Sequence, residues 1–274
     1  MPIALLTDFG PASAYVGAMK GVIARLAPGI PVLDLAHDIT PQAVDEASFV
    51  LLHTYRYFPD DTVFACVVDP GVGTGRGVLA VAAGGRRFVA PDNGLLADVL
   101  AAEPHARVHA VTARELFVEP VSDTFHGRDV FAPVAAWLAR GLAVARLGPP
   151  CTPLPAPWRV RAAAERAGEA APVAGWRRGR VRTVDRFGNL VTDIAVPEGV
   201  AALRAARLAG RTIAVRARTF GEAPEDGTPF LYVGSYGTLE IACRGGSAAA
   251  ALGIGRGAEV ALEVTRSEET VRTP

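Results

Sequence analysis

Lysine and cysteine are scarce in this chain of 274 residues, and long hydrophobic runs are absent. Lys20 is the single lysine among many arginines, while the three cysteines, Cys66, Cys151 and Cys243, show no metal-ligand spacing. An odd number of scattered cysteines is typical of free thiols in a reducing cytosol. No segment reaches the ~18 consecutive apolar residues of a membrane span, and the first residues lack the basic region of a signal peptide. We therefore expect a cytoplasmic protein.

Charge of one sign is also lacking. The 28 basic and 28 acidic side chains balance to a formal net charge of zero, and no block of basic residues occurs. Proteins that bind nucleic acids or anionic membranes through phosphate groups carry clustered Lys and Arg. The composition therefore indicates that neither nucleic acid nor membrane is a partner.

Strand and helix patterns alternate over the first part of the chain. Buried strands are expected at residues 3–6, 31–35 and 63–68, with helices at 13–26 and 44–57, the second capped by Thr40 and Pro41. Two apolar segments joined by Gly84 and Gly85 predict a hairpin, followed by a helix at 95–102, a strand at 108–111 and a helix at 131–140. This order predicts an α/β domain at 1–150, with a Rossmann-like, mostly parallel sheet.

The pattern changes where prolines become dense. Residues 151–175 are rich in proline and alanine and are predicted to form a linker. Beyond them, short β-like segments recur between glycine turns, at 180–184, 190–194, 212–216, 230–233, 238–242 and 259–264. We expect residues 176–274 to form a smaller, all-β barrel domain.

The most informative segment runs from Asp69 to Arg76, with a carboxylate and a guanidinium at the two ends of a glycine-rich turn. It follows the predicted strand at 63–68, and ligands bind beyond the carboxyl ends of strands in α/β sheets. A surface ion pair on an ordinary turn would explain the same residues. A second polar cluster, Phe125 to Asp129, precedes a predicted helix and favours a site over that plainer interpretation.

Other known sites fit these residues less well. Glycines 71, 73 and 75 suggest a phosphate cradle, but the P-loop Lys-Ser/Thr is missing and a strand follows, so we reject a Rossmann phosphate site. Asp8 follows the first strand, where a carboxylate suits either a ribose diol or a loop cap. Metal ligation remains an alternative without supporting spacing, for Asp8, His37, Asp38, Asp69 and His126.

Several motifs taken together closely resemble one family. They are Thr7-Asp8-Phe9-Gly10, Asp69 to Gly73, Arg76, Pro91-Asp92-Asn93-Gly94, Phe125 to Asp129, Asp185 to Asn189, and Ser235 to Ala242. The chain is similar from end to end to the S-adenosylmethionine hydroxide adenosyltransferases, relatives of the fluorinase and chlorinase. That resemblance implies an N-terminal α/β domain, a C-terminal β-barrel, and a homotrimer with active sites at subunit interfaces.

The resemblance also implies residue roles. Asp69, Arg76 and His126 match the family's catalytic set, and Asp8 would hold the ribose hydroxyls. The remaining substrate-binding positions would be Phe9, Asn93, Phe125, Asp185, Phe187, Asn189, Ser235, Tyr236 and Glu240. In the halogenases a tyrosine takes the position of Asp69, so the acid and His126 favour water over halide as the nucleophile.

The implied reaction is hydrolysis of S-adenosyl-L-methionine to adenosine and L-methionine, by attack of water at the 5′ carbon. S-adenosylmethionine is then the substrate, and neither a metal nor a further cofactor is expected. A halide-using adenosyltransferase and a non-catalytic nucleoside-binding module are alternatives. A metal-dependent phosphatase is a further alternative, which a chelator would test.

Overall fold

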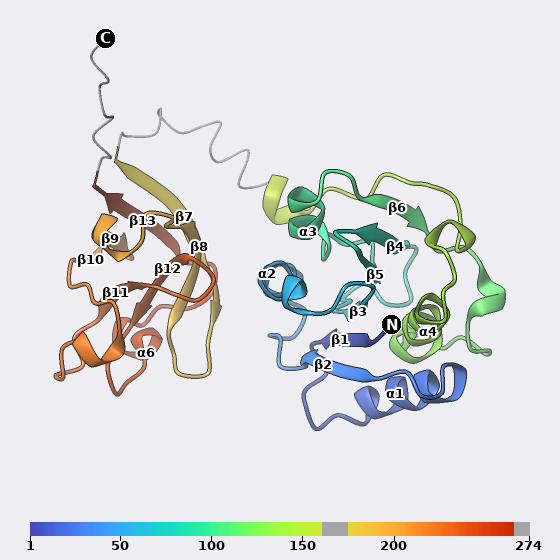
Figure 1. Ribbon diagram of the computed structural model, residues 1–274. Coiled ribbons are helices and arrows are strands. Elements are labelled where there is room, and N and C mark those ends of the chain that lie inside the picture. Colours follow the sequence, from blue (N-terminus) through green and yellow to red (C-terminus); the bar gives the residue numbers. More distant parts are fainter. Residues whose placement is uncertain (161–174, 266–274) are drawn as a thin grey trace, which may run out of the picture. The chain divides into compact units, whose positions relative to one another are not determined.

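The computed structural model describes residues 1–160 and 175–265, which form two compact units, one before and one after residues 161–174 in the sequence (Figure 1). Most of the expected linker at 151–175 thus lies outside the described residues. Each unit has its own sheet and its own hydrophobic core. The two units are therefore considered separately.

The first unit is built on a six-stranded mixed sheet with the order β2-β1-β3-β5-β4-β6. Its strands are β1 (Ile3–Thr7), β2 (Val32–Ala36), β3 (Val63–Val67), β4 (Val78–Ala83), β5 (Arg86–Pro91) and β6 (Arg107–Ala110). The pairings β2-β1, β1-β3 and β3-β5 are parallel, whereas β4 pairs antiparallel with both β5 and β6. The predicted hairpin is confirmed, and it makes the sheet mixed because β4 runs back against its neighbours.

Helices cover both faces of this sheet (Figure 1). They are α1 (Ala14–Leu26) and α4 (Ala132–Ala139) on one face, and α2 (Val44–Thr54) and α3 (Ala97–Ala102) on the other. Successive residues of a strand point to opposite faces. Accordingly Ile3 and Leu5 join the core with α1 and α4, while Ala4 and Leu6 join the core with α2 and α3.

The parallel pairing of β1 with β3 places their carboxyl ends at one edge of the sheet. Thr7 pairs with Val67, so the residues that follow, Asp8 and Asp69, leave the sheet at the same end. This edge is where ligands bind in α/β sheets. The fold thus brings two of the predicted site loops to one place.

The second helix begins at Val44 as expected, but its predicted cap was wrong. Thr40 does not cap it: α2 begins after Ala43, and the Ala43 N–H bonds the Thr40 carbonyl in a turn. Gln42 in this turn adopts a left-handed φ of 65°, which a helix cannot accommodate. Its backbone N–H donates to Asp8, so a contact across the fold decided this backbone shape.

The second unit contains a seven-stranded antiparallel sheet with the order β10-β9-β13-β7-β8-β12-β11. Its strands are β7 (Trp176–Val184), β8 (Leu190–Ala195), β9 (Leu203–Leu208), β10 (Arg211–Ile213), β11 (Phe230–Val233), β12 (Thr238–Ala242) and β13 (Glu259–Val264). The two edges of this sheet lie close together: the Leu231 N–H of β11 donates to the carbonyl of Val215, which follows β10, at 2.8 Å. The sheet is barrel-like, and the expected all-β character is confirmed.

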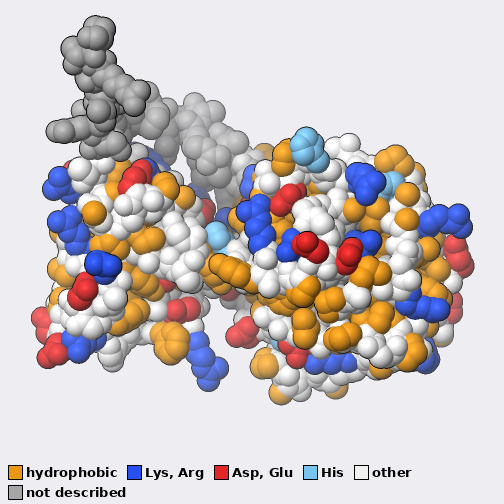
Figure 2. Space-filling view, viewed as in Figure 1, with side chains coloured by type: hydrophobic (Ala, Val, Ile, Leu, Met, Phe, Trp, Pro, Cys, Tyr) orange, Lys and Arg blue, Asp and Glu red, His pale blue; other side chains and the backbone are white. Residues whose placement is uncertain are grey.

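Shorter elements complete both units. The α-helix α6 (Ala248–Leu252) and strand β9 were not expected from the sequence. Single 3-10 turns lie at Tyr55–Tyr57, Arg114–Leu116, Val144–Arg146, Val200–Ala202 and Phe220–Glu222. Among the described residues, no helix combines the length and apolarity that crossing a membrane requires. Basic and acidic side chains are interspersed on the face drawn in Figure 2.

Candidate active site

A nearly buried ion pair lies at the carboxyl end of β3. Arg76 Nε donates to Asp69 Oδ1 at 2.9 Å and to Oδ2 at 3.0 Å, and Arg76 Nη2 also donates to Oδ2. The side chains of Arg76 and Asp69 are only 10% and 4% exposed. Charge-assisted bonds of this forked kind hold both planes in a fixed orientation. The glycine-rich turn therefore presents a rigid carboxylate and not a mobile surface pair.

The turn between the two charges depends on glycine. Gly73 has a φ of +76°, and a Cβ there would lie 2.4 Å from the carbonyl oxygen of Asp123. A Cβ at Gly71 would lie 3.3 Å from Cγ of Arg76. The backbone at Gly73 thus passes directly against the segment that leads into His126.

His126 accepts a hydrogen bond from Arg76. The Arg76 Nη2 to His126 Nδ1 distance is 2.8 Å, and because arginine only donates, Nδ1 must be the acceptor. The proton of the neutral ring therefore lies on Nε2. Burial, and next the charge of Arg76, hold the pKa of His126 below its usual 6.5. At neutral pH His126 is then an uncharged ring with an Nε2–H available to donate.

A turn of π-helix follows His126. Residues Gly127–Phe131 form it, directly ahead of α4, and such insertions often occur at functional sites. Asp129 within it is fully buried, and its carboxylate accepts from Arg128 and from the Ser122 N–H at 2.9 Å. The Arg76 guanidinium carbon also lies 5.5 Å from the centre of the Phe131 ring. These contacts hold the loop that carries His126.

Three aromatic rings group beside these loops. Phe125 lies 5.9 Å from Phe9 and 4.7 Å from Tyr15, measured between ring centres. Tyr15 is 56% exposed. Since Phe9 follows Asp8 and Phe125 precedes His126, the rings form an apolar, partly exposed surface next to polar site residues.

The side chains of Asp8 and Asn93 both form hydrogen bonds with backbone groups. Asp8 Oδ2 accepts from the Gln42 N–H at 2.8 Å. Asn93 Nδ2 donates to the Val68 carbonyl at 2.9 Å, and its Oδ1 accepts from the Leu95 N–H at 3.2 Å. Asn93 therefore braces the residue before Asp69, a role that its turn motif did not reveal.

The five candidate metal ligands do not assemble. Asp69 is bound by Arg76, and both ring nitrogens of His37 are taken, by Thr7 and Asp34. Within residues 1–160 and 175–265, no group of three or more His, Cys, Asp or Glu side chains is arranged to hold a metal ion. The side-chain geometry of the described residues thus gives the metal alternative no support.

In the second unit, the candidate residues cluster in the turn between β7 and β8. Asp185 Oδ1 accepts from the backbone N–H of Phe187 at 2.9 Å and of Asn189 at 2.8 Å. Its Oδ2 accepts from Asn189 Nδ2 at 2.8 Å. Asn189 is buried and its Oδ1 has no partner among the described residues, while Phe187 is 76% exposed. The turn holds an aromatic ring outward and leaves a buried acceptor free.

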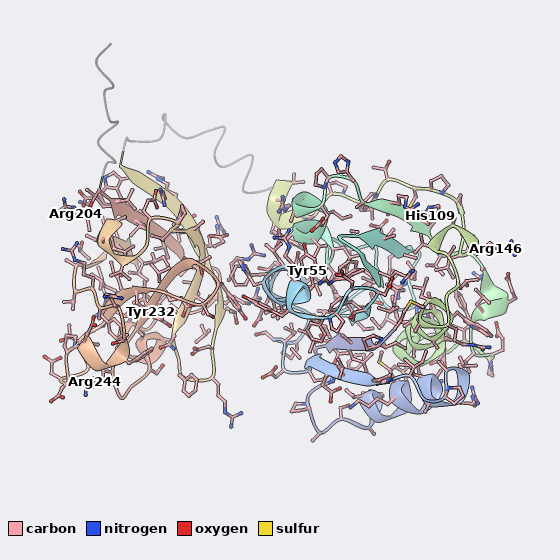
Figure 3. All side chains as sticks on the ribbon, in the orientation of Figure 1. Tyr55, His109, Arg146, Arg204, Tyr232 and Arg244 are labelled. Atoms are coloured by element: carbon pink, nitrogen blue, oxygen red, sulfur yellow. The ribbon has the colours of Figure 1, made fainter. Side chains whose placement is uncertain are left out.

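Glu240 lies on β12 opposite Tyr232 of β11, and the Tyr232 hydroxyl donates to its carboxylate (Tyr232 is labelled in Figure 3). Burial raises the pKa of Glu240, and the charge of Asp185 raises it further. Ser235 is exposed and Tyr236 half-buried in the turn that joins these strands. The sequence analysis did not identify Tyr232 as a partner of Glu240. Pairing the two strands on either side of this turn would have placed the two residues opposite each other.

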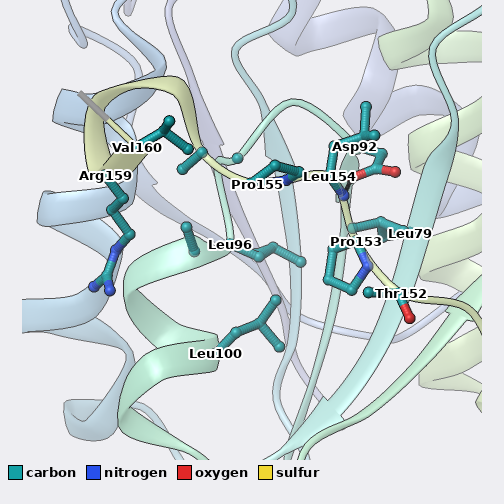
Figure 4. A pocket seen from close by; sticks show the side chains of 13 residues that line it. Leu79, Asp92, Leu96, Leu100, Thr152, Pro153, Leu154, Pro155, Arg159 and Val160 are labelled. Atoms are coloured by element: carbon teal, nitrogen blue, oxygen red, sulfur yellow. Dashed lines mark hydrogen bonds between the residues drawn. The ribbon is translucent and has the colours of Figure 1, made fainter. Parts of the chain in front are cut away.

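One apolar pocket of the first unit lies elsewhere (Figure 4). It is lined by Leu96, which precedes α3, by Leu100 of α3 and by the chain around Pro153. Arg159, which also lines it, pairs with Asp98. Neither Asp69, Arg76 nor His126 lines it. The pocket is thus separate from the polar cluster at the end of β3.

Two family models match the chain. The SAM hydroxide adenosyltransferase N-terminal domain matches residues 3–148, and the C-terminal domain of the same family matches residues 179–261. The chain belongs to the SAM hydroxide adenosyltransferase family. The polar cluster of the first unit and the Asp185 turn of the second fall within the two matched regions.

Similar proteins agree with this family. A protein of Thermus thermophilus named (R)-S-adenosyl-L-methionine hydrolase is 42% identical, over 95% of this chain and 99% of its own. One of Salinispora tropica with the same name is 41% identical, over 92% and 94%. A fluorinase of Actinoplanes is more distant, at 27% over 88% and 90%. A crystal structure of an uncharacterized conserved protein from Thermotoga maritima aligns with a TM-score of 0.82 and 35% identity, over 95% and 99%.

Proposed function

We propose that this family member hydrolyses S-adenosyl-L-methionine to adenosine and L-methionine, by in-line attack of water at the 5′ carbon. Three relatives that carry the hydrolase name are 40–42% identical over most of the chain, and a fourth is 32% identical over 72% of it, whereas the fluorinase relatives are 27–28% identical. The joined Asp69, Arg76 and His126 side chains are the single observation that carries the chemistry.

The reaction needs help on the side of the nucleophile only. Methionine leaves as a neutral thioether from a positively charged sulfonium, so no acid has to protonate it. Free water loses a proton only near pH 15.7 and reacts poorly until it is oriented and a base accepts its proton. Orientation alone supplies on the order of 7–11 kcal/mol in well-positioned reactions.

The hydrogen-bond directions divide the work between the three residues. Arg76 occupies Nδ1 of His126, so the ring offers its Nε2–H to the oxygen of the attacking water. Asp69 has lone pairs beyond those that Arg76 engages, and its carboxylate accepts the proton that the water releases. Arg76 holds both partners in place and offsets charge that develops on the water.

The remaining candidate residues would bind the substrate. Asp8 would hold the ribose hydroxyls, with Phe9 and Phe125 beside it. From the second unit, Asp185, Phe187 and Asn189 would contact the methionine or adenosine portions. We also propose a homotrimer in which one subunit's first unit and a neighbour's second unit share each active site, an arrangement that only the family resemblance supports.

A mass-spectrometric assay tests the reaction. Purified protein is incubated with and without chelator, and with each sulfonium epimer of S-adenosyl-L-methionine separately, because the relatives are named for the (R) form. We expect adenosine and methionine in equal amounts from the (R) epimer, with oxygen from labelled water in adenosine. Unchanged substrate would refute hydrolysis, and loss of activity with chelator would revive a metal-dependent reaction. Added chloride or fluoride would give a halogenated nucleoside if halide were the nucleophile.

Mixing two inactive variants tests the shared site. Asp69→Asn removes the proposed base of the first unit, and Asp185→Ala opens the turn of the second unit. After the two variants are unfolded together and refolded, mixed trimers would contain some sites with both wild-type halves, and activity would return. Mixtures that stay inactive, although each variant refolds, would rule out sites shared between subunits.

A further inference from the structure

A row of four side chains runs beneath the loop that carries Asp8. Thr7 Oγ1 lies 2.9 Å from His37 Nδ1, and His37 Nε2 lies 2.9 Å from Asp34 Oδ1. Lys20 Nζ completes the row, 2.8 Å from Asp34 Oδ2. Thr7 is fully buried and the His37 side chain is 6% exposed, whereas Asp34 and Lys20 reach the surface. A buried hydroxyl is thus connected to solvent through an imidazole.

Donors and acceptors alternate along this row without conflict. The Asp34 carboxylate only accepts, so in the neutral form of the His37 ring the proton lies on Nε2 and Nδ1 accepts from the Thr7 hydroxyl. The Thr7 oxygen then accepts from the Phe9 backbone N–H at 3.3 Å. One arrangement of protons therefore satisfies every member.

Thr7 and His37 hold the backbone that follows Asp8. The Thr7 hydroxyl accepts from the Phe9 N–H, and the backbone carbonyl of His37 accepts from the Gly10 N–H at 2.7 Å. Asp8 directly precedes these two anchored residues, and its Oδ2 accepts from the Gln42 N–H. Among the described residues, its Oδ1 accepts no hydrogen bond and remains for a ligand.

We propose that His37, acting through Thr7, is a positioning residue that aims Asp8 at the ribose and sets the preference for a 2′-hydroxyl. This inference rests on the proposed role of Asp8 in the same site. A site built to bond a hydroxyl rejects analogues that lack it, but only when its acceptor is held in place. Loosening the 7–10 turn would lower affinity for the ribose form and leave binding of the deoxy form nearly unchanged.

Matched substitutions separate positioning from general stability. Asn at position 37 places its amide oxygen near Nδ1, so it retains an acceptor for Thr7. Gln places its amide near Nε2 and retains only the contact with Asp34. At position 7, Ser keeps the hydroxyl, whereas Val keeps the shape and loses it. Thermal midpoints of all four variants show how far each one disturbs the fold.

The experiment measures binding of adenosine and 2′-deoxyadenosine by calorimetry, so it does not depend on turnover. We expect wild type to prefer adenosine, and Thr7→Val and His37→Gln to reduce that preference about tenfold, the upper range for one hydrogen bond. Thr7→Ser and His37→Asn should keep it within about threefold. Asp8→Asn sets the scale for a lost ribose acceptor.

The results separate the two proposals. If wild type hydrolyses S-adenosylmethionine but all four variants keep the adenosine preference, the positioning role is wrong and the reaction stands. If His37→Asn and His37→Gln lose the preference for adenosine to the same extent, and that loss follows the fall in their thermal midpoints, the role of His37 is structural only. This inference then fails. Wild type without any preference for adenosine also overturns it. Nucleoside preference that responds as expected, without hydrolysis, would retain the inference and refute the reaction.

Discussion

The polar clusters of the two units are assembled in different ways. In the first unit, Arg76 lies 50 residues before His126, and the two meet only because their loops converge beyond the sheet. In the second unit, Asp185 bonds Phe187 and Asn189 within a single turn. The cluster of the first unit depends on loops that are far apart in the sequence, whereas the side-chain bonds of Asp185 stay within one turn.

Their charges differ as well. Asp69 of the first unit is matched by Arg76 in a forked ion pair. In the second unit, the buried Glu240 lies near the charge of Asp185 and is bonded by the neutral Tyr232 hydroxyl. The carboxylate of the first cluster is paired with a cation, whereas burial and the charge of Asp185 raise the pKa of Glu240 in the second. Variants of either cluster should therefore affect different quantities.

The largest effect is expected at Asp69. Asp69→Asn keeps the shape but removes the proton acceptor, so kcat should fall by about 10²–10⁴, the usual range for a lost acid-base group. Asp185→Asn, at the turn proposed to bind substrate, should mainly raise KM. Both constants come from an adenosine-release assay, with the exposed Asp38→Asn as the control. Wild-type kcat in Asp69→Asn would contradict the assignment.

Activity should also depend on the protonation of His126. Burial and the charge of Arg76 lower its pKa, so the ring is neutral above pH 6.5 and activity should be level there. Below the lowered pKa, Nδ1 gains a proton against Arg76 and the rate should fall about tenfold per pH unit. His126→Gln, which retains a donor near Nε2, should keep more activity than His126→Asn. A rate that changes with pH above 6.5 would argue against a neutral His126 as the hydrogen-bond donor. So would a higher activity of His126→Asn than of His126→Gln.

A stability test compares two neighbouring glycines of the first unit. Gly73→Ala would force a left-handed alanine against the Asp123 carbonyl, at an expected cost of about 1–3 kcal/mol of unfolding free energy. Gly75→Ala is the matched control, because a Cβ there meets nothing within 4 Å. Chemical denaturation measures both. Equal stability of the two variants would show that the close approach at Gly73 is not needed.

The smallest effect concerns two glutamates. The pKa of Glu240 is raised, so the folded protein keeps a proton that the unfolded chain releases, and stability falls as pH rises above the ordinary 4.5. Glu240→Gln should therefore become more stable relative to wild type as pH rises through this interval. Glu103 of the first unit, whose pKa is lowered by bonds from Tyr55 and Arg56, should show the opposite sign. Thermal midpoints of both Glu→Gln variants from pH 4 to 8 test this. If the stability of both variants relative to wild type changed in the same direction with pH, the expected difference between the two units would be contradicted.

Much of the fold was predictable because its signals are local. Continuous apolar runs located β1 and β3, short β-like segments between glycine turns located β11, β12 and β13, and Gly84-Gly85 marked the β4-β5 hairpin. The Thr40 cap failed because Gln42 turns to reach Asp8, a contact 34 residues away. Strand β9 was missed because its sequence, Leu203–Leu208, carries two arginines and two alanines and lacks an apolar run like that of β11.

The sequence by itself determined the alternating elements, the strand ends that carry Asp8 and Asp69, and the self-contained turn at Asp185. Propensity, periodicity and short-range hydrogen bonds act over a few residues and can be recognised there. Only the tertiary structure decided that Arg76 bonds His126, that His37 supports Thr7, and that Tyr232 faces Glu240. Such contacts depend on strand register and on close approach of separate loops, which are properties of the packed chain.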